Sequence, residues 1–256
     1  MRQALVLVDL QNDFMPGGAL AVPEGDRVVP LANHLARTFD LVVATQDWHP
    51  ADHGSFAAGH PGRQPGEVID LHGLPQVLWP VHCVQDTPGA DFHPDLDRSR
   101  ITRIIHKGTD PQVDSYSGFY DNGHRHATGL GDFLKEKGVT GVFVLGLATD
   151  YCVKATAIDA VRLGYTTWLV EDACRGVGLH PGDIPAAIQD MIRAGVALTR
   201  SGQLMPPEIE SLTPHPGPYG RTEGSVRPLQ RQIPGRLLEE SGPATLQTDR
   251  EGDRKA

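Results

Sequence analysis

The feature that most constrains the fold of this chain is a repeated alternation between short apolar runs and segments of helical periodicity. Six runs rich in β-branched residues are predicted as strands: QALVLVDL (3–10), LVVATQD (41–47), ITRIIHKG (101–108), GVFVLGLA (141–148), TTWLVED (166–172) and GVALTRS (195–201). Several of them are apolar at consecutive positions, which is typical of a parallel sheet that is covered on both faces.

Predicted helices precede four of these strands, at 26–39, 130–138, 152–164 and 183–195. Strands that alternate with helices favour parallel pairing with right-handed crossovers. We therefore predict an α/β fold, a three-layer α/β/α sandwich around a six-stranded, mainly parallel, Rossmann-like sheet.

The alternation stops near residue 205, and this sets the expected domain organisation. The last 52 residues of the 256-residue chain are rich in Pro, Gly and charged side chains and show no sustained period. Such a composition buries too little apolar surface to fold by itself. We predict one domain at residues 1–204 and a polar tail at 205–256 that is disordered or loosely attached.

Charge and cysteine content narrow the class of partner. A net charge of -9 and a pI near 5.7 argue against nucleic acid or an anionic membrane as partner. The apolar stretch ALVLV is interrupted by Asp9 and is too short for a signal peptide, and no run approaches the ~18 apolar residues of a membrane helix. Three widely spaced cysteines do not form a disulfide framework. We expect a cytoplasmic protein, either a monomer or a homo-oligomer.

Reactive side chains stand where the predicted strands end. Asp9 ends the first strand, Lys107 ends the third, and Cys152 follows the fourth at the start of a helix. Each has an ordinary interpretation alone, as a turn cap, a solvated lysine or a small buried side chain. In an open α/β sheet, however, ligands bind beyond the carboxyl ends of the strands, so their joint placement favours a site.

These three side chains make chemical sense together. An ammonium and a helix N-terminus both favour the thiolate form of a cysteine. Asp9 could accept the proton of Cys152 and later return it to a leaving amine. The turn between strand and helix also exposes backbone N–H groups that could bind an oxyanion.

A second set of polar residues suggests a metal site. ATQDWHPADHGSF (44–56) supplies Asp47, His49 and His53, and LWPVHCVQDTPGADFHP (78–94) supplies His82. Asp47 and His49 are two residues apart and share one side of a strand. One carboxylate with two or three imidazoles suits one divalent ion, Zn²⁺, Fe²⁺ or Mn²⁺. For Cys83 we expect a packing role.

Six motifs resemble, in order, the signatures of the nicotinamidase/pyrazinamidase family of isochorismatase-like cysteine hydrolases. They are LVDLQNDF, ATQDWHP, WPVHCVQDTPGADFHPDL, HKG, DSYSGF and LGLATDYCVKATAIDA, and the match spans roughly residues 2 to 201. The resemblance implies an amidohydrolase that converts nicotinamide, and also pyrazinamide, through a cysteine thioester. Its products would be nicotinate and ammonia, in NAD salvage.

The resemblance also implies roles for individual residues. The catalytic triad would be Asp9, Lys107 and Cys152. The metal that coordinates the pyridine nitrogen would be held by Asp47, His49 and His82, while His53 matches a histidine that is a ligand in some relatives and not in others.

The substrate pocket and the oxyanion hole follow from the same resemblance. Phe14 and Trp79 match aromatic residues that sandwich the ring, and Tyr116 matches a pocket wall. A cis peptide would join Leu147 to Ala148, and the N–H groups of Ala148 and Cys152 would form the oxyanion hole.

Other functions remain open at this point. An amidase of the same superfamily could act on a ureido or carbamoyl substrate. A metal-dependent hydrolase could use bound water and keep Cys152 as a structural residue. An inactive binding protein is disfavoured by the complete triad, and isochorismate hydrolysis by the thiol and the metal site. We expect the segment TDPQVDSYSGF to be slightly longer than in compact relatives, so the resemblance does not fix the pocket rim or the substrate range.

Overall fold

A computed structural model describes residues 2–204, and within them it confirms the α/β prediction. Six parallel strands form one sheet in the order β5-β2-β1-β6-β7-β8. Their bounds are β1 (Gln3–Val8), β2 (Val42–Asp47), β5 (Arg103–Lys107), β6 (Gly141–Leu147), β7 (Thr166–Arg175) and β8 (Ala197–Thr199). The prediction for the tail at 205–256 lies outside the described residues.

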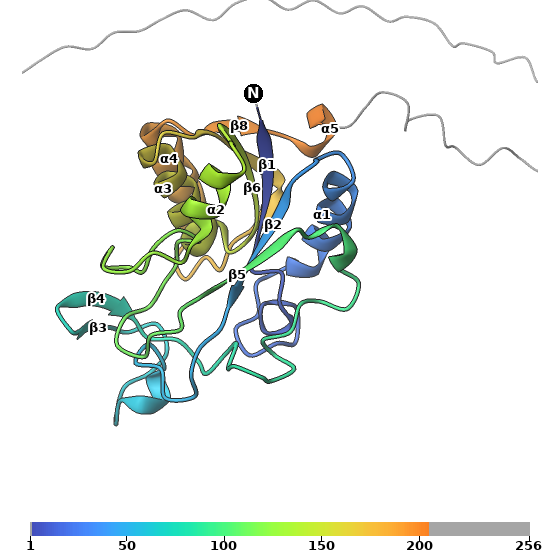
Figure 1. Ribbon diagram of the computed structural model, residues 1–256. Helices are drawn as coiled ribbons and strands as arrows, with labels where there is room; N and C mark the ends of the chain where they lie inside the picture. The colour runs from blue at the N-terminus through green and yellow to red at the C-terminus, as the bar shows by residue number, and fades with distance from the viewer. Residues whose placement is uncertain (1, 205–256) are drawn as a thin grey trace, which may run out of the picture. The chain divides into compact units, whose positions relative to one another are not determined.

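Helices cover both faces of the sheet and complete the three layers (Figure 1). Helix α1 (Val28–Ala36) packs on one face together with α5 (Ser201–Leu204). Helices α2 (Leu130–Glu136), α3 (Lys154–Arg162) and α4 (Asp183–Ala194) lie on the other. Each of the four predicted helices is present. Helix α1 is shorter than predicted: it begins at Val28 because residues 25–27 form a 3-10 turn, and it ends at Ala36.

The core lies along the central strands. All seven residues of β6 and all six of β2 are buried, as the consecutive apolar positions predict for strands covered on both faces. Gly146 lets β6 approach β1, because a Cβ at this position would lie 2.2 Å from the carbonyl oxygen of Val8. Close approach here sets the position of the turn that follows β6.

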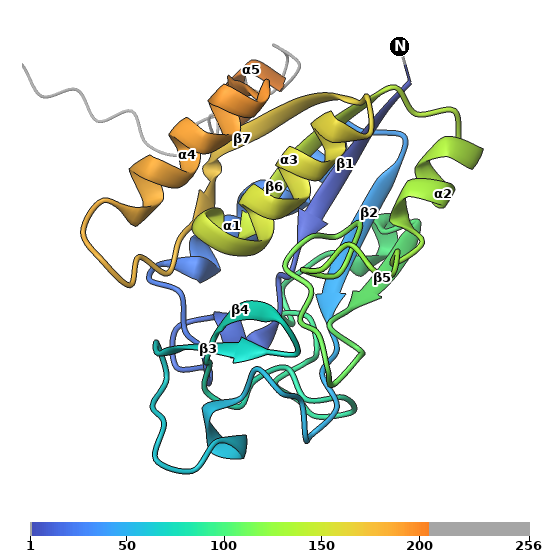
Figure 2. The same cartoon turned by 90° about the vertical axis from the view of Figure 1, so that its left-hand side faces the viewer.

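Loops and one hairpin gather at the carboxyl ends of the strands. The hairpin of β3 (Val68–Leu71) and β4 (Leu74–Val77) was not predicted. In Figure 2 the arrowheads of β1 and β2 point toward this hairpin and toward the loops around it. Residues 48–100 thus cover the edge of the sheet where the predicted site residues emerge. Within residues 2–204, none of the helices has the length and apolar character needed to cross a membrane.

Candidate active site

Three strand ends bring the predicted triad together. The Nζ atom of Lys107 lies 2.8 Å from Oδ2 of Asp9 and 3.4 Å from Sγ of Cys152. It also donates a 3.0 Å hydrogen bond to the carbonyl oxygen of Ser115. The side chains of Lys107 and Asp9 are completely buried. The convergence expected from the strand ends is therefore present.

Lys107 also forms an ion pair that was not predicted, with Oδ1 of Asp47. The two residues are register partners at the ends of the neighbouring strands β2 and β5. One ammonium thus joins the triad to the expected metal site. Burial lowers the pKa of Lys107, but Asp47 and Asp9 outweigh it and hold this pKa well above its usual value.

Asp9 occupies a left-handed backbone conformation just after β1, with φ 50°, which aspartate tolerates better than most residues. Its Oδ1 accepts a 2.6 Å hydrogen bond from the hydroxyl of Thr45. Burial raises the pKa of Asp9 to about 6, although the ammonium of Lys107 acts in the opposite direction. At neutral pH the group is mainly a carboxylate and can accept a proton.

Two opposing effects act on the thiol of Cys152. Burial raises its pKa well above its usual value, while the ammonium of Lys107 lowers it, in the direction predicted from the sequence, and offsets only part of the effect of burial. A base that accepts the thiol proton would therefore assist the attack of the sulfur.

The turn after β6 positions Cys152. The peptide between Leu147 and Ala148 is cis, as the resemblance implied. A π-helical turn at Thr149–Val153 follows and leads into α3, so Cys152 lies two residues before the regular helix. The carboxylate of Asp150 accepts hydrogen bonds from the backbone of Val177 (2.9 Å) and Gly178 (2.8 Å). This side chain ties the turn to the loop that follows β7.

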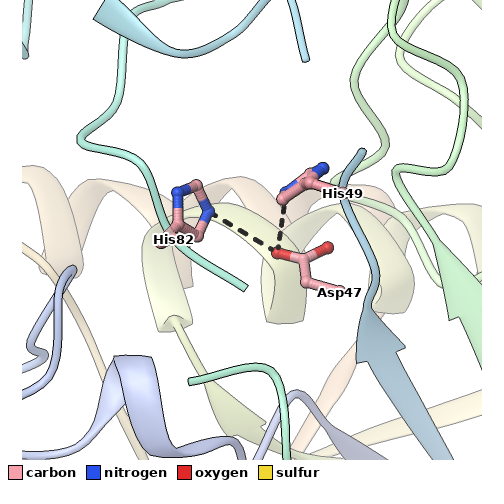
Figure 3. Close-up of side chains that lie close together, drawn as sticks. All are labelled: Asp47, His49 and His82. Carbon is pink, nitrogen blue, oxygen red and sulfur yellow. Dashed lines mark ion pairs between the residues drawn. The ribbon is translucent and has the colours of Figure 1, made fainter. Parts of the chain in front are cut away.

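Asp47, His49 and His82 form the predicted metal-binding group (Figure 3). Oδ2 of Asp47 lies 3.6 Å from Nε2 of His49 and 3.9 Å from Nε2 of His82. The Nδ1 atoms bond to carbonyl oxygens at 2.8 Å, that of His49 to Gly108 and that of His82 to Pro80. Both rings therefore direct Nε2 toward the shared carboxylate, as backbone-anchored histidine ligands do.

The ionisation of Asp47 and His82 suits a cation, whereas for His49 the carboxylate of Asp47 outweighs burial and raises the pKa. Burial raises the pKa of Asp47, but Lys107 and His49 outweigh it and hold this pKa well below its usual range. Burial and the neighbouring His49 lower the pKa of His82 to about 4. At neutral pH the site offers a carboxylate and a neutral imidazole, which are the forms that bind a divalent metal.

His53 is placed differently from the other histidines. A ring nitrogen of His53 lies close to a ring nitrogen of His49 and to a carboxylate oxygen of Asp114. His53 does not belong to the group formed by Asp47, His49 and His82. Its Nδ1 bonds to the hydroxyl of Ser55 at 2.7 Å, and its buried Nε2 has no partner among the described residues. Direct ligation by His53 stays a prediction.

One cavity contains the predicted pocket residues together with the nucleophile. Phe14, Trp79 and Tyr116 line it, as do Ala148 and Cys152. The same cavity is lined by Asp47 and His82. A flat ring between these walls would therefore face the thiol and the metal-binding group at once.

Sequence reasoning missed four other lining residues, Leu20, Asp114, Tyr151 and Val177. Tyr151 packs edge-on against Trp79, with the ring centroids 4.8 Å apart. Asp114 and Tyr151 stand within the quoted motifs DSYSGF and LGLATDYCVKATAIDA, so their position beside residues with assigned roles was the available signal.

Comparisons with known proteins agree with this arrangement. Residues 3–203 match the family model described as the isochorismatase domain. The nicotinamidase of Escherichia coli (strain K12) is 52% identical over 200 residues, which cover 77% of this chain and 93% of that protein.

Two solved structures share the fold over most of their length. The nicotinamidase/pyrazinamidase of Acinetobacter baumanii superposes with a TM-score of 0.78 at 50% identity, covering 80% of this chain and 98% of that one. The pyrazinamidase of Pyrococcus horikoshii in complex with zinc has a TM-score of 0.64 at 41% identity, covering 78% and 99% respectively.

Proposed function

Because this chain belongs to the isochorismatase family, and within it to the nicotinamidases, we propose that it hydrolyses nicotinamide to nicotinate and ammonia. Pyrazinamide, which carries the same carboxamide on a similar ring, is a second substrate. The reaction releases nicotinate for NAD salvage.

The observation that carries this proposal is the convergence of Asp9, Lys107 and Cys152 at an aromatic cavity. The ammonium lies within 3.4 Å of the sulfur and 2.8 Å of the carboxylate. Phe14 and Trp79 give the cavity flat apolar walls suited to a heteroaromatic ring.

Acylation begins when Asp9 accepts the proton of Cys152. The sulfur then attacks the carboxamide carbon, and the negative charge that develops on the carbonyl oxygen is held by the N–H groups of Ala148 and Cys152. The C–N bond breaks as Asp9 gives its proton to the leaving amine. Ammonia departs and the acyl group remains on the sulfur as a thioester.

Deacylation repeats these steps with water. Asp9 accepts a proton from the water as its oxygen attacks the thioester carbon, and the same N–H groups hold the oxyanion. The C–S bond then breaks, nicotinate leaves, and the sulfur recovers its proton. Lys107 keeps its positive charge throughout and stabilises Asp9 and the sulfur in their charged forms.

The residues at the metal-binding group fit a divalent cation. Asp47, His49 and His82 would hold it, since their donor atoms already face one another. When bound, the cation supplies a Lewis acid to which the pyridine nitrogen donates its lone pair, so that the ring is oriented. The zinc in the pyrazinamidase of Pyrococcus horikoshii supports zinc as the ion.

The compartment and the assembly state complete the proposal. Three free, buried cysteines fit a reducing compartment, and we place the protein in the cytoplasm. Nothing in the mechanism needs a second chain, so a monomer and a homo-oligomer would both be active.

An ammonia-release assay tests the proposal. Purified protein would be given nicotinamide, pyrazinamide and a carbamoylated amino acid, and its metal content would be measured by elemental analysis. We expect ammonia from the two ring amides and about one metal ion per chain. Turnover of the carbamoyl compound with none of the ring amides would refute it.

A further inference from the structure

The hydroxyl of Tyr116 receives hydrogen bonds from two sides at the wall of the cavity. The indole N–H of Trp79 donates to its oxygen at 3.1 Å, and Nε2 of Gln76 lies at the same distance. An indole nitrogen can only donate. The oxygen of Tyr116 is thus an acceptor on its buried side.

The orientation of the Gln76 amide is fixed by two oxygens that can only accept. Nε2 of Gln76 lies 2.8 Å from the carbonyl oxygen of Val77 and 3.0 Å from Oδ2 of Asp114. With the amide reversed, its own oxygen would face both of these oxygens. The nitrogen therefore faces Tyr116 as well, where one of its two N–H groups is shared between two oxygens. Because an amide nitrogen does not accept, the hydroxyl proton of Tyr116 does not point toward it.

Asp114 is held in turn by the backbone. Its Oδ1 accepts a 2.7 Å hydrogen bond from the N–H of Ser115, which leaves Oδ2 for Gln76. Asp114 and Gln76 are 3% and 2% exposed, so solvent does not compete strongly for these bonds.

The proton of the Tyr116 hydroxyl then has one remaining direction. Its oxygen faces the N–H donors of Trp79 and Gln76, and within residues 2–204 its own O–H donates no hydrogen bond. Tyr116 lines two cavities, but Trp79, which contacts its hydroxyl, lines only the one that holds Cys152, so this proton faces the space where the substrate binds.

We infer that Asp114 and Gln76 are positioning residues that keep the Tyr116 hydroxyl as a hydrogen-bond donor into the cavity, where it binds an acceptor atom of the aromatic carboxamide. This inference rests on the proposed function. The hydroxyl would add a hydrogen-bond donor to a cavity whose aromatic walls are apolar, so a bound ligand would need a matching acceptor. The acceptor is either the carboxamide oxygen or, in a diazine, the second ring nitrogen.

The variant Asp114→Asn reverses the polarity of this position while keeping its shape. Its oxygen has to face the N–H of Ser115, so its amide nitrogen faces Gln76. Gln76 then gives up its hydrogen bond to Val77 and turns its oxygen toward that nitrogen, and this oxygen accepts the hydroxyl proton of Tyr116. The donor into the cavity is lost although the tyrosine remains.

The test is a double-mutant cycle on the metal-loaded protein. Asp114→Asn, Tyr116→Phe and the double variant are compared for kcat and KM, with Asp132→Asn on α2 as a matched control. Each single variant should lower kcat/KM for nicotinamide about 3–10-fold, mainly through KM, since one hydrogen bond contributes about 0.5–1.5 kcal/mol. The double variant should fall within about twofold of Tyr116→Phe.

A comparison of the two ring amides identifies the acceptor. Equal losses for nicotinamide and pyrazinamide assign it to the carboxamide oxygen, and a larger loss for pyrazinamide assigns it to the second ring nitrogen. If Asp114→Asn does not fold, Gln76→Glu gives the same cycle, because it places an oxygen that can accept the hydroxyl proton of Tyr116 where the amide nitrogen stood.

Three results would overturn the inference: an unchanged Asp114→Asn variant, additive losses in the double variant, or loss of metal from Asp114→Asn. Loss of metal would mean that Asp114 supports the metal-binding group by way of the neighbouring His49, and not the Tyr116 hydroxyl. A wild-type protein that releases no ammonia from nicotinamide would instead refute the proposed function.

Discussion

Replacing Lys107 by methionine should destabilise the protein strongly, because its ammonium is the shared partner of two buried carboxylates. Lys107 is completely buried, it lies 2.8 Å from Asp9, and it also pairs with Asp47. Removing one partner of a buried ion pair costs about 3–5 kcal/mol, since the charge that remains has lost its solvation. We expect a loss of this size in the free energy of unfolding of the metal-free protein at pH 7.

The loss should depend on pH in a defined direction. The pKa of Asp9 is already raised to about 6, above its ordinary value of 3.8, and without the ammonium it should rise further. A carboxyl group whose pKa is raised by folding stabilises the protein less as pH increases from its unfolded value toward its folded value. The deficit of Lys107→Met should therefore be smaller at pH 5 than at pH 7.

Urea unfolding at the two pH values measures this effect. Adding Asp9→Asn to Lys107→Met should restore part of the stability, because an amide at this position does not ionise. Lys135→Met on α2, where the lysine is exposed, should change stability by no more than about 0.5 kcal/mol. A loss below about 1 kcal/mol for Lys107→Met, or one independent of pH, would refute the reasoning.

Three further predictions follow from the site and the sheet. Asp9 has to be a carboxylate, so kcat/KM should fall about tenfold per pH unit below about 6, where this group takes up a proton; a pH profile that stays flat to pH 5 would contradict this. His82→Ala removes one of three expected metal ligands, and elemental analysis should show most of the metal lost, with KM raised more than kcat is lowered. Gly146→Ala should lose at least about 2 kcal/mol of stability in thermal unfolding, because the added Cβ would meet the backbone of Val8 at 2.2 Å and φ is +127°; a normal midpoint would count against the close approach of β6 to β1.

The large elements were predictable because their physical signals are local. Consecutive apolar residues identify the buried strand β6, and the alternation with helices implies parallel pairing. The β3–β4 hairpin was missed because its two-residue turn is His72-Gly73, both with positive φ, and histidine is a weaker turn signal than asparagine or aspartate.

The residues of the site were easier to predict than their pKa values and hydrogen bonds. Strand ends predicted that Asp9, Lys107 and Cys152 lie at one edge of the sheet, and in the fold Lys107 contacts both of the others. The pKa of the thiol was not predictable, because it depends on how completely residues from distant parts of the chain cover the sulfur. The bond from Gln76 to Asp114 joins residues 38 positions apart and leaves no periodic signal in the sequence.

Turnover of nicotinamide by Cys152→Ala, with Cys174→Ala as the matched buried-cysteine control, tests the central claim most directly. Cys174 lies in β7, where its thiol donates to the carbonyl oxygen of Val170, and it takes no part in the proposed chemistry. With folding and metal content unchanged, ammonia release should drop to background in Cys152→Ala and persist in Cys174→Ala. Substantial turnover by Cys152→Ala would contradict covalent catalysis by this sulfur.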